Sequence, residues 1–350
     1  MSTASEHPLL DIKHLSVVYG GGHRGVPLRA VDDVSLEIRE GETVGLVGES
    51  GSGKTTIGRA VLGLTEPSSG AISFDGTDIT HAPWRQRRAL ARHLQVVFQD
   101  PYSSLNPART IGQTLTETLR VHDKSSRAET EERVIALLQK VGLDRTALAR
   151  YPAHFSGGQR QRIAIARALV TEPRLVICDE PVSALDLSVQ AQVLNLFRKL
   201  QQDFSLSYLF IAHDLAVVRF LSHRIIVLYR GRIMEQGPAE TVYEHPLHPY
   251  TKALLAAAPV PDPVEQTSRR EARREFSTST TSAAPASPES CPFAARCPYV
   301  TDICRTQRPP LEPAPDDTFV ACHHWKELNE EMGPRRRREG QLIESGPQVA

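Results

Sequence analysis

The chain has 350 residues, enough for one large α/β domain and a small additional segment. Hydrophobic residues make up 40% and charged residues 23% of the chain, which are ordinary globular proportions and exclude a wholly disordered or fibrous protein. Lys and Arg together number 41, as do Asp and Glu, so the overall charge gives no indication of a nucleic-acid partner.

The N-terminal residues include Glu6 and lack a basic region followed by an apolar core, so we expect no secretory signal. No uninterrupted apolar run approaches the ~20 residues of a membrane-spanning helix. We therefore expect a protein made and kept in the cytoplasm. Any attachment to the membrane has to come from a partner.

The beginning of the chain predicts a β-rich part and then a phosphate-binding unit. Residues 11–19 and 30–38 read as strands, and residues 43–47 form a short apolar run that ends in a glycine-rich turn. Residues 55–63 then read as a helix. Between this strand and helix, residues 48–55 fit the pattern G-x-x-x-x-G-K-[ST] of a phosphate loop.

The phosphate loop predicts how a nucleotide would be held. Its glycines let successive N–H groups and the helix N-terminus face the phosphates, while Lys54 adds a positive charge and Thr55 can ligate Mg²⁺. We expect ATP to contact Gly48, Ser50, Gly51, Ser52, Gly53, Lys54, Thr55 and Thr56.

The remaining elements predict a mixed sheet with a helical insertion. Residues 71–74 read as a strand, and the patterning is helical from about residue 99 to 171. Residues 175–178 and 208–212 resemble buried parallel strands, at whose carboxyl ends ligands gather. Residues 224–235 read as a hairpin.

An acidic pair follows the apolar run 175–178. Asp179 is suited to hold Mg²⁺ through its coordination shell, and Glu180 could polarise the attacking water. A positioned general base contributes ~10²–10⁴ in rate. An acidic strand end by itself is more often just exposed, but after a phosphate loop the catalytic interpretation is favoured.

The segment Ser156-Gly-Gly-Gln159 precedes a strongly helical run. A hydroxyl and bare amides at a helix N-terminus can bind an anion, although an ordinary helix cap explains the same residues and is favoured by physics alone. Followed by Arg160-Gln-Arg162, however, this segment resembles the signature of ABC ATPases, and the other motifs of that family occur in order over about residues 9–256. Phe155 departs from the commonest signature, which has Leu there.

The resemblance implies a P-loop ABC ATPase fold: a mixed sheet core, an N-terminal antiparallel β subdomain and a helical subdomain. Gln99 resembles the glutamine loop, Ser183-Ala-Leu-Asp186 the D-loop and His213 the switch histidine. Tyr19 matches the position that stacks on adenine, with core packing as the alternative. The family resemblance thus implies that the catalytic residues are Glu180, His213 and Gln99. It implies that the Mg²⁺ ligands are Thr55, Gln99 and Asp179. Further ATP contacts are implied for Tyr19, Ser156, Gly157, Gly158, Gln159 and Asp186.

Residues 99–107, 178–186 and 245–251 resemble the dipeptide/oligopeptide importer ATPases, which include nickel systems. This resemblance implies a second homologous ATPase subunit, two transmembrane permeases, an extracytoplasmic solute-binding protein and a peripheral location on the cytoplasmic face of the membrane. The sequence does not identify the transported solute. The alternative from another class is a soluble ABC ATPase of DNA repair or translation, but the chain has neither a long coiled-coil insertion nor a second ATPase half.

Beyond the ATPase domain, residues 1–258, we expect a flexible linker at 259–290, a cysteine segment at 291–325 and a polar disordered tail at 326–350. Four of the five cysteines are spaced as C-x₅-C-x₆-C-x₁₇-C, which suits Zn²⁺ or a [4Fe–4S] cluster. The absence of a C-x₂-C pair weighs against a ribbon-type zinc site. The family resemblance favours a [4Fe–4S] cluster on Cys291, Cys297, Cys304 and Cys322, with Zn²⁺ as the alternative.

Overall fold

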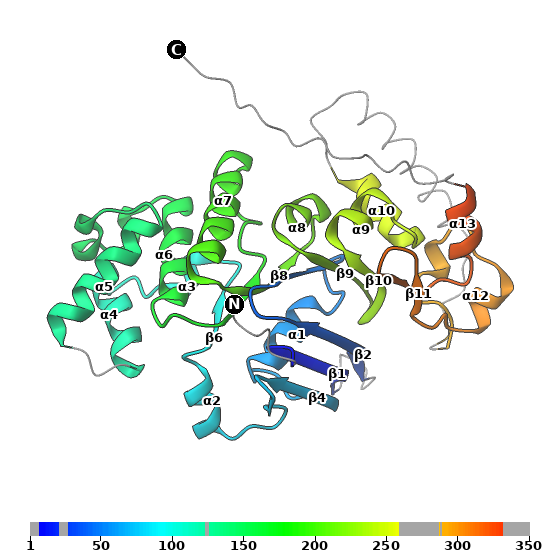
Figure 1. The fold of residues 1–350 in the computed structure, drawn as a ribbon, viewed down its shortest axis with the longest axis horizontal. Helices are drawn as coiled ribbons and strands as arrows, with labels where there is room; N and C mark the ends of the chain where they lie inside the picture. Colours follow the sequence, from blue (N-terminus) through cyan, green and yellow to red (C-terminus); the bar gives the residue numbers. More distant parts are fainter. Residues whose placement is uncertain (1–6, 21–26, 123–125, 259–286, 288, 332–350) are drawn as a thin grey trace, which may run out of the picture.

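The computed structural model describes residues 7–20, 27–122, 126–258, 287 and 289–331 (Figure 1). Its strands are β1 (Leu10–Tyr19), β2 (Leu28–Ile38), β3 (Thr43–Val47), β4 (Ser69–Phe74), β5 (Thr77–Asp78), β6 (Leu94–Val97), β7 (Leu175–Asp179), β8 (Ser207–Ala212), β9 (Arg224–Tyr229), β10 (Arg232–Pro238), β11 (Glu312–Ala314) and β12 (Thr318–Val320).

The helices follow the same order along the chain. They are α1 (Lys54–Val61), α2 (Trp84–Leu90), α3 (Pro101–Ser104), α4 (Ile111–His122), α5 (Arg127–Lys140), α6 (Gly157–Leu169), α7 (Leu187–Phe204), α8 (Leu215–Leu221), α9 (Ala239–Glu244), α10 (Pro249–Ala257), α12 (Asp302–Thr306) and α13 (Trp325–Glu331), with 3₁₀ turns η1 (Arg145–Ala149), η2 (Pro152–His154) and η4 (Ala294–Arg296). Among the helices described, none has the length and apolar character to cross a bilayer.

The strands form two sheets, as the expected fold class requires. The antiparallel sheet has the order β2-β1-β4-β5, and the larger sheet has the order β11-β12-β10-β9-β3-β8-β7-β6. In the larger sheet β6, β7, β8, β3 and β9 run parallel, and every residue of β3 and β8 is buried. Continuous apolar runs form these strands because both of their faces are covered.

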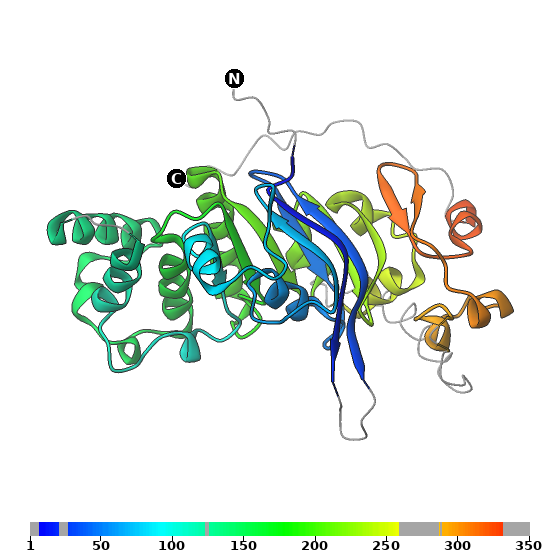
Figure 2. The ribbon, with the colours of Figure 1, turned by 90° about the horizontal axis from the view of Figure 1, so that it is seen from below.

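Alternate residues of the parallel strands pack on opposite faces of the sheet. Ile177 and Leu209 join a core that includes α1 and the antiparallel sheet, whereas Val176 and Phe210 join a core with the helices of the other face. This is the two-residue period of a strand acting on an apolar run. Figure 2 shows the helices α4 to α6 at one end of the molecule and the C-terminal segment at the other, with the sheets between them.

The C-terminal segment continues the main sheet. β12 pairs antiparallel with β10, with Glu235 opposite Val320, and β11 pairs with β12. Helix α13, which carries the buried Trp325 and Leu328, takes up the start of the expected tail. The rest of that tail, residues 332–350, and residues 259–286 and 288 of the expected linker lie outside the described residues.

Candidate active site

The phosphate loop connects β3 to α1 and requires glycine at two positions. Gly53 caps α1 with φ +105°, and within the described residues no side chain caps that helix. A Cβ on Gly48 would lie 2.1 Å from the Leu228 carbonyl oxygen. Ser52 Oγ is buried and has no hydrogen-bond partner in the part of the chain that the structure describes. The uncapped N–H groups and this hydroxyl fit an anionic ligand.

Lys54 lies buried in the loop. Its Nζ donates to the carbonyl oxygens of Gly48 (2.7 Å) and Glu49 (2.9 Å). Burial lowers the pKa of Lys54, while the carboxylates of Glu180, Asp179 and Glu49 act to raise it. The ammonium is thus held at the loop, where it can interact with ATP phosphates.

An oxygen pair suited to Mg²⁺ lies beside the loop. Thr55 Oγ1 donates to Asp179 Oδ1 at 2.9 Å, which joins the start of α1 to the end of β7. Burial, with the neighbouring Glu180 carboxylate, raises the pKa of Asp179. Magnesium is bound by oxygen ligands, so this pair fits the predicted role of Thr55 and Asp179, and Mg²⁺ binding by these residues and by Gln99 stays a prediction.

The carboxyl ends of β6, β7 and β8 bring the three predicted catalytic side chains together. Glu180 Oε2 accepts from Gln99 Nε2 at 3.2 Å and lies 3.5 Å from His213 Nδ1. Gln99 Nε2 also contacts Ser183 Oγ at 3.3 Å, a partner that was not predicted. The backbone of Glu180 has φ +48°, an uncommon conformation for a non-glycine residue and one enriched at functional sites.

The predicted signature residues serve as a helix cap within this chain. Ser156 Oγ accepts from the N–H of Gln159 at 3.3 Å, and the Ser156 N–H donates to Gln159 Oε1 at 3.1 Å. Asp186 caps α7 by accepting from the Val189 N–H at 3.0 Å. In Figure 1 helix α6 lies among the helices on the left and α1 in the centre. ATP contacts by the signature residues and by Asp186 therefore stay a prediction that needs a second subunit.

Tyr19 ends β1 with 39% of its surface exposed. Its hydroxyl lies 3.5 Å from Thr65 Oγ1. This exposure argues against the alternative of plain core packing, and adenine stacking stays a prediction.

The four clustered cysteines line one small cavity, together with His248, Phe293, His323 and His324. None of the five cysteines, all of which the structure describes, forms a disulfide bond. Burial raises the pKa of Cys291 to about 11 and those of Cys297 and Cys322 to about 12. Within the described residues no group of three or more His, Cys, Asp or Glu side chains is arranged to hold a metal ion. The structure thus gathers the predicted thiols without a metal-binding geometry.

Sequence reasoning did not predict that Arg296 contacts the phosphate loop. The Arg296 guanidinium donates two hydrogen bonds of 2.9 Å to the Glu49 carboxylate. The two residues lie 247 positions apart, so no local pattern could have paired them.

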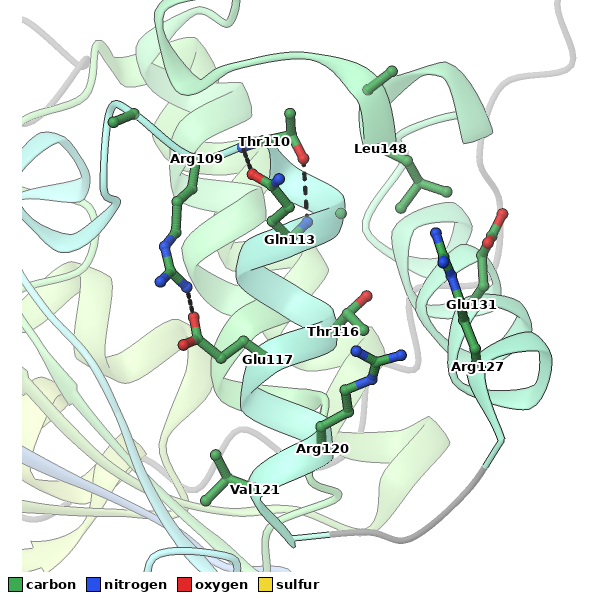
Figure 3. Close-up of a pocket in the computed structure, with 13 residues that line it drawn as sticks. Arg109, Thr110, Gln113, Thr116, Glu117, Arg120, Val121, Arg127, Glu131 and Leu148 are labelled. Carbon is green, nitrogen blue, oxygen red and sulfur yellow. Dashed lines mark hydrogen bonds and ion pairs between the residues drawn. The ribbon is translucent and has the colours of Figure 1, made fainter.

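A wide pocket lies between α4 and α5 (Figure 3). Arg109 forms an ion pair with Glu117 on one side of it, and Arg127 and Glu131 of α5 lie across from α4. Among the described residues its lining includes none of the predicted nucleotide contacts. This pocket is therefore not the ATP site.

Comparison with known proteins agrees with this geometry. A phosphate loop between a buried strand and a helix, with an acidic pair beside it, defines a nucleotide-binding protein of the P-loop class. Residues 31–183 match the ABC transporter family, and residues 234–304 match the C-terminal region of oligopeptide/dipeptide transporters. The chain belongs to the ABC transporter family, in the branch with this C-terminal region, and it is an ATPase.

Relatives and solved structures support the assignment. A putative peptide import ATP-binding protein of Brucella ovis is 49% identical over 319 residues, covering 91% of this chain and 98% of that protein. The di/tripeptide transport ATP-binding protein DppF of Pseudomonas aeruginosa is 46% identical over 318 residues, covering 90% and 96%. The dimeric ATP-binding cassette MJ0796, bound to ADP and phosphate, is 28% identical with a TM-score of 0.60, covering 66% of this chain and 98% of that one.

Proposed function

We propose that this chain hydrolyses ATP to drive the import of dipeptides or oligopeptides through a membrane complex. The observation that carries this proposal is the joint presence of the Gln99–Glu180–His213 cluster and of the C-terminal region shared with oligopeptide/dipeptide transporters. Nickel or another small solute is the alternative cargo, because no residue of this chain is expected to contact the solute. A role in DNA repair or translation has no comparable support.

The ATP site needs a second ATPase subunit. Ser156 lies at the start of α6 and Lys54 at the start of α1, and we expect the two residues to belong to two different ATP sites. A solved relative is described as a dimer with ADP and phosphate. We infer that the signature of this chain completes the site of a homologous partner subunit, and that the partner's signature completes the site at Lys54.

The segment 99–107 is suited to transmit closure of the ATPase pair to a permease. Gln99 contacts the catalytic Glu180, and a few residues later α3 presents Tyr102, which is 60% exposed. Arg160 of α6 lies over the Tyr102 ring at 4.2 Å. This segment therefore links the catalytic residues to the exposed surface. The complex would include two permeases and an external solute-binding protein, with this chain bound peripherally at the cytoplasmic face.

Purification of the membrane complex through a tag on this chain tests its composition. We expect mass spectrometry to identify two permeases and a second ATPase. Vesicles containing the complex should take up a labelled dipeptide in an ATP-dependent manner in the presence of the solute-binding protein. Uptake of Ni²⁺ but of no peptide would replace the cargo assignment, and co-purification without permeases would contradict the transporter role.

We also propose that Cys291, Cys297, Cys304 and Cys322 ligate a [4Fe–4S] cluster, with Zn²⁺ as the alternative. Four thiols that line one cavity are the donor set that such a cluster requires. Both nitrogens of His324 are engaged, by Thr301 Oγ1 at 2.8 Å and by Glu327 Oε2 at 2.9 Å, so we do not expect this histidine to be a ligand. A cluster would stabilise the small cysteine segment, because metal binding to thiolates is coupled to folding.

Iron analysis after anaerobic purification tests this ligand set. We expect about four irons and four sulfides per chain. Cys291→Ser should lower the iron content, whereas Cys178→Ala, which changes a buried cysteine on β7, should leave it unchanged. Stoichiometric zinc without iron would refute the cluster in favour of the alternative.

A further inference from the structure

Glu49 of the phosphate loop has each of its polar groups engaged by a different part of the chain. Its N–H donates to the Tyr250 hydroxyl at 2.9 Å, and its carbonyl accepts from Lys54 Nζ at 2.9 Å. Its two carboxylate oxygens accept from Arg296 Nη1 and Nη2, each at 2.9 Å. A bidentate Arg–carboxylate pair fixes orientation as well as distance, so both the backbone and the side chain of Glu49 are held in place.

The two distant partners of Glu49 share an aromatic support. Tyr250 of α10 is fully buried, with its ring 4.5 Å from that of Tyr229 and 5.4 Å from that of Phe293. The Arg296 guanidinium lies 5.6 Å from the Phe293 ring and 5.9 Å from the Tyr229 ring. Packed rings restrict the rotamers of both groups, so the contact with Glu49 is presented by a rigid surface.

The Arg296–Glu49 pair also affects the charge at the phosphate site. The Glu49 carboxylate acts electrostatically on Lys54, which places a negative charge within reach of the phosphate site. An unpaired carboxylate at this position would repel the phosphates of ATP. The Arg296 guanidinium lies 2.9 Å from each carboxylate oxygen, and because an arginine is always charged, it offsets the charge of the carboxylate.

We propose that Arg296 is a positioning residue for ATP binding: by holding and neutralising the Glu49 carboxylate, it keeps the phosphate loop in the shape that receives the phosphates. The C-terminal cysteine segment thereby contributes to the nucleotide site of its own chain. This role rests on ATP binding by the phosphate loop, and it requires neither a particular solute nor a metal at the cysteines.

Nucleotide titration of the full chain tests this role. Arg296→Met should raise the Kd for MgATP by about 1.5-fold to fivefold, the range for a pair whose side chains are 37% and 40% exposed. Arg296→Lys keeps the positive charge but cannot form the bidentate pair, so its affinity for MgATP should lie between those of Arg296→Met and the parent. The matched control is Arg305→Met, an exposed arginine of the same segment on α12, which should bind like the parent. In the assembled complex, Arg296→Met should raise KM for ATP and leave kcat near the parent value.

A Glu49→Ala background separates this role from general damage to the segment. There, Arg296→Met should no longer change the Kd, because its effect passes through Glu49. The same rise in Kd in both backgrounds, or an equal rise in Arg305→Met, would overturn the role of Arg296. So would an unchanged Kd in a folded Arg296→Met. Lys54→Ala tests the loop itself: if this variant bound ATP normally, the phosphate-loop assignment would fail, which is a different failure.

Discussion

Replacement of Glu180 by Gln tests whether its carboxylate activates the attacking water. The change exchanges one oxygen for an amide group, and the remaining oxygen can still accept the 3.2 Å hydrogen bond from Gln99. The fold and the ATP contacts should therefore be kept, and the loss should lie in the chemical step. A positioned general base is worth about 10²–10⁴ in rate, or about 2.7–5.4 kcal/mol of activation free energy.

Phosphate release by the purified complex, together with the Kd for MgATP, measures this effect. We expect turnover to fall by at least about a hundredfold while the Kd stays within about twofold of the parent value. Glu172→Gln is the matched control, since Glu172 also has a positive φ, +52°, but its side chain is 61% exposed and pairs with Arg133. Turnover of the Glu180 variant within about threefold of the parent would refute a general-base role.

The other predictions address the loop, the signature and the C-terminal contact. Lys54→Ala should weaken MgATP binding by more than about tenfold in a nucleotide titration, because it removes the charge at the phosphates. A Ser156→Arg subunit mixed with a normal partner should inactivate the site whose phosphate loop belongs to the partner, as measured by turnover at each composite site. Burial raises the pKa of Glu235 from 4.5 to about 7, so this group stabilises the fold below pH 4.5 and that contribution is lost as the pH rises through 7. Glu235→Gln cannot ionise, and between pH 5 and pH 8 the parent should therefore lose unfolding free energy relative to the variant, on the order of 3 kcal/mol at most, as measured by chemical denaturation.

Local patterns predicted the elements that position the phosphate loop. The run 43–47 is β3 as expected, because a short apolar stretch before a glycine-rich turn has few other stable structures. The hairpin 224–235 forms from β9 and β10, and Arg230 and Gly231 at its turn both have positive φ. The parallel order of the strands also brings Gln99, Glu180 and His213 to one edge, as their strand-end positions suggested.

The contacts of the C-terminal segment could not be predicted in this way. β12 has three residues and follows a three-residue strand that contains Pro313, so neither has the length or alternation that marks a strand in sequence. Its pairing with β10 depends on an edge formed about 85 residues earlier, where Glu235 lies opposite Val320. Arg296 and Glu49 are even farther apart in the sequence, and no periodicity in the sequence indicates which residue a charged side chain will pair with.

The surroundings of the phosphate loop indicate where ATP-driven movement arises. The Gly231 N–H donates to the Ser52 carbonyl at 2.8 Å, and a Cβ on Gly53 would meet the Ala30 carbonyl oxygen at 2.3 Å. With Glu49 held by Tyr250 and Arg296 on another side, the loop is packed or bonded to the antiparallel sheet, the β9–β10 hairpin and the C-terminal segment. Gln99 and His213, by contrast, are exposed and contact Glu180 through their side chains.

Because the loop is fixed to the rest of the fold, we expect closure on ATP to be carried by the segments that follow β6, β7 and β8. Phosphates should protect the N–H groups of residues 48–53 directly, so the informative segments in hydrogen exchange of the complex with and without ATP are residues 99–107, 180–186 and 213–215. We expect exchange to change in all three, and unchanged exchange in these segments would contradict the view that they carry the closure.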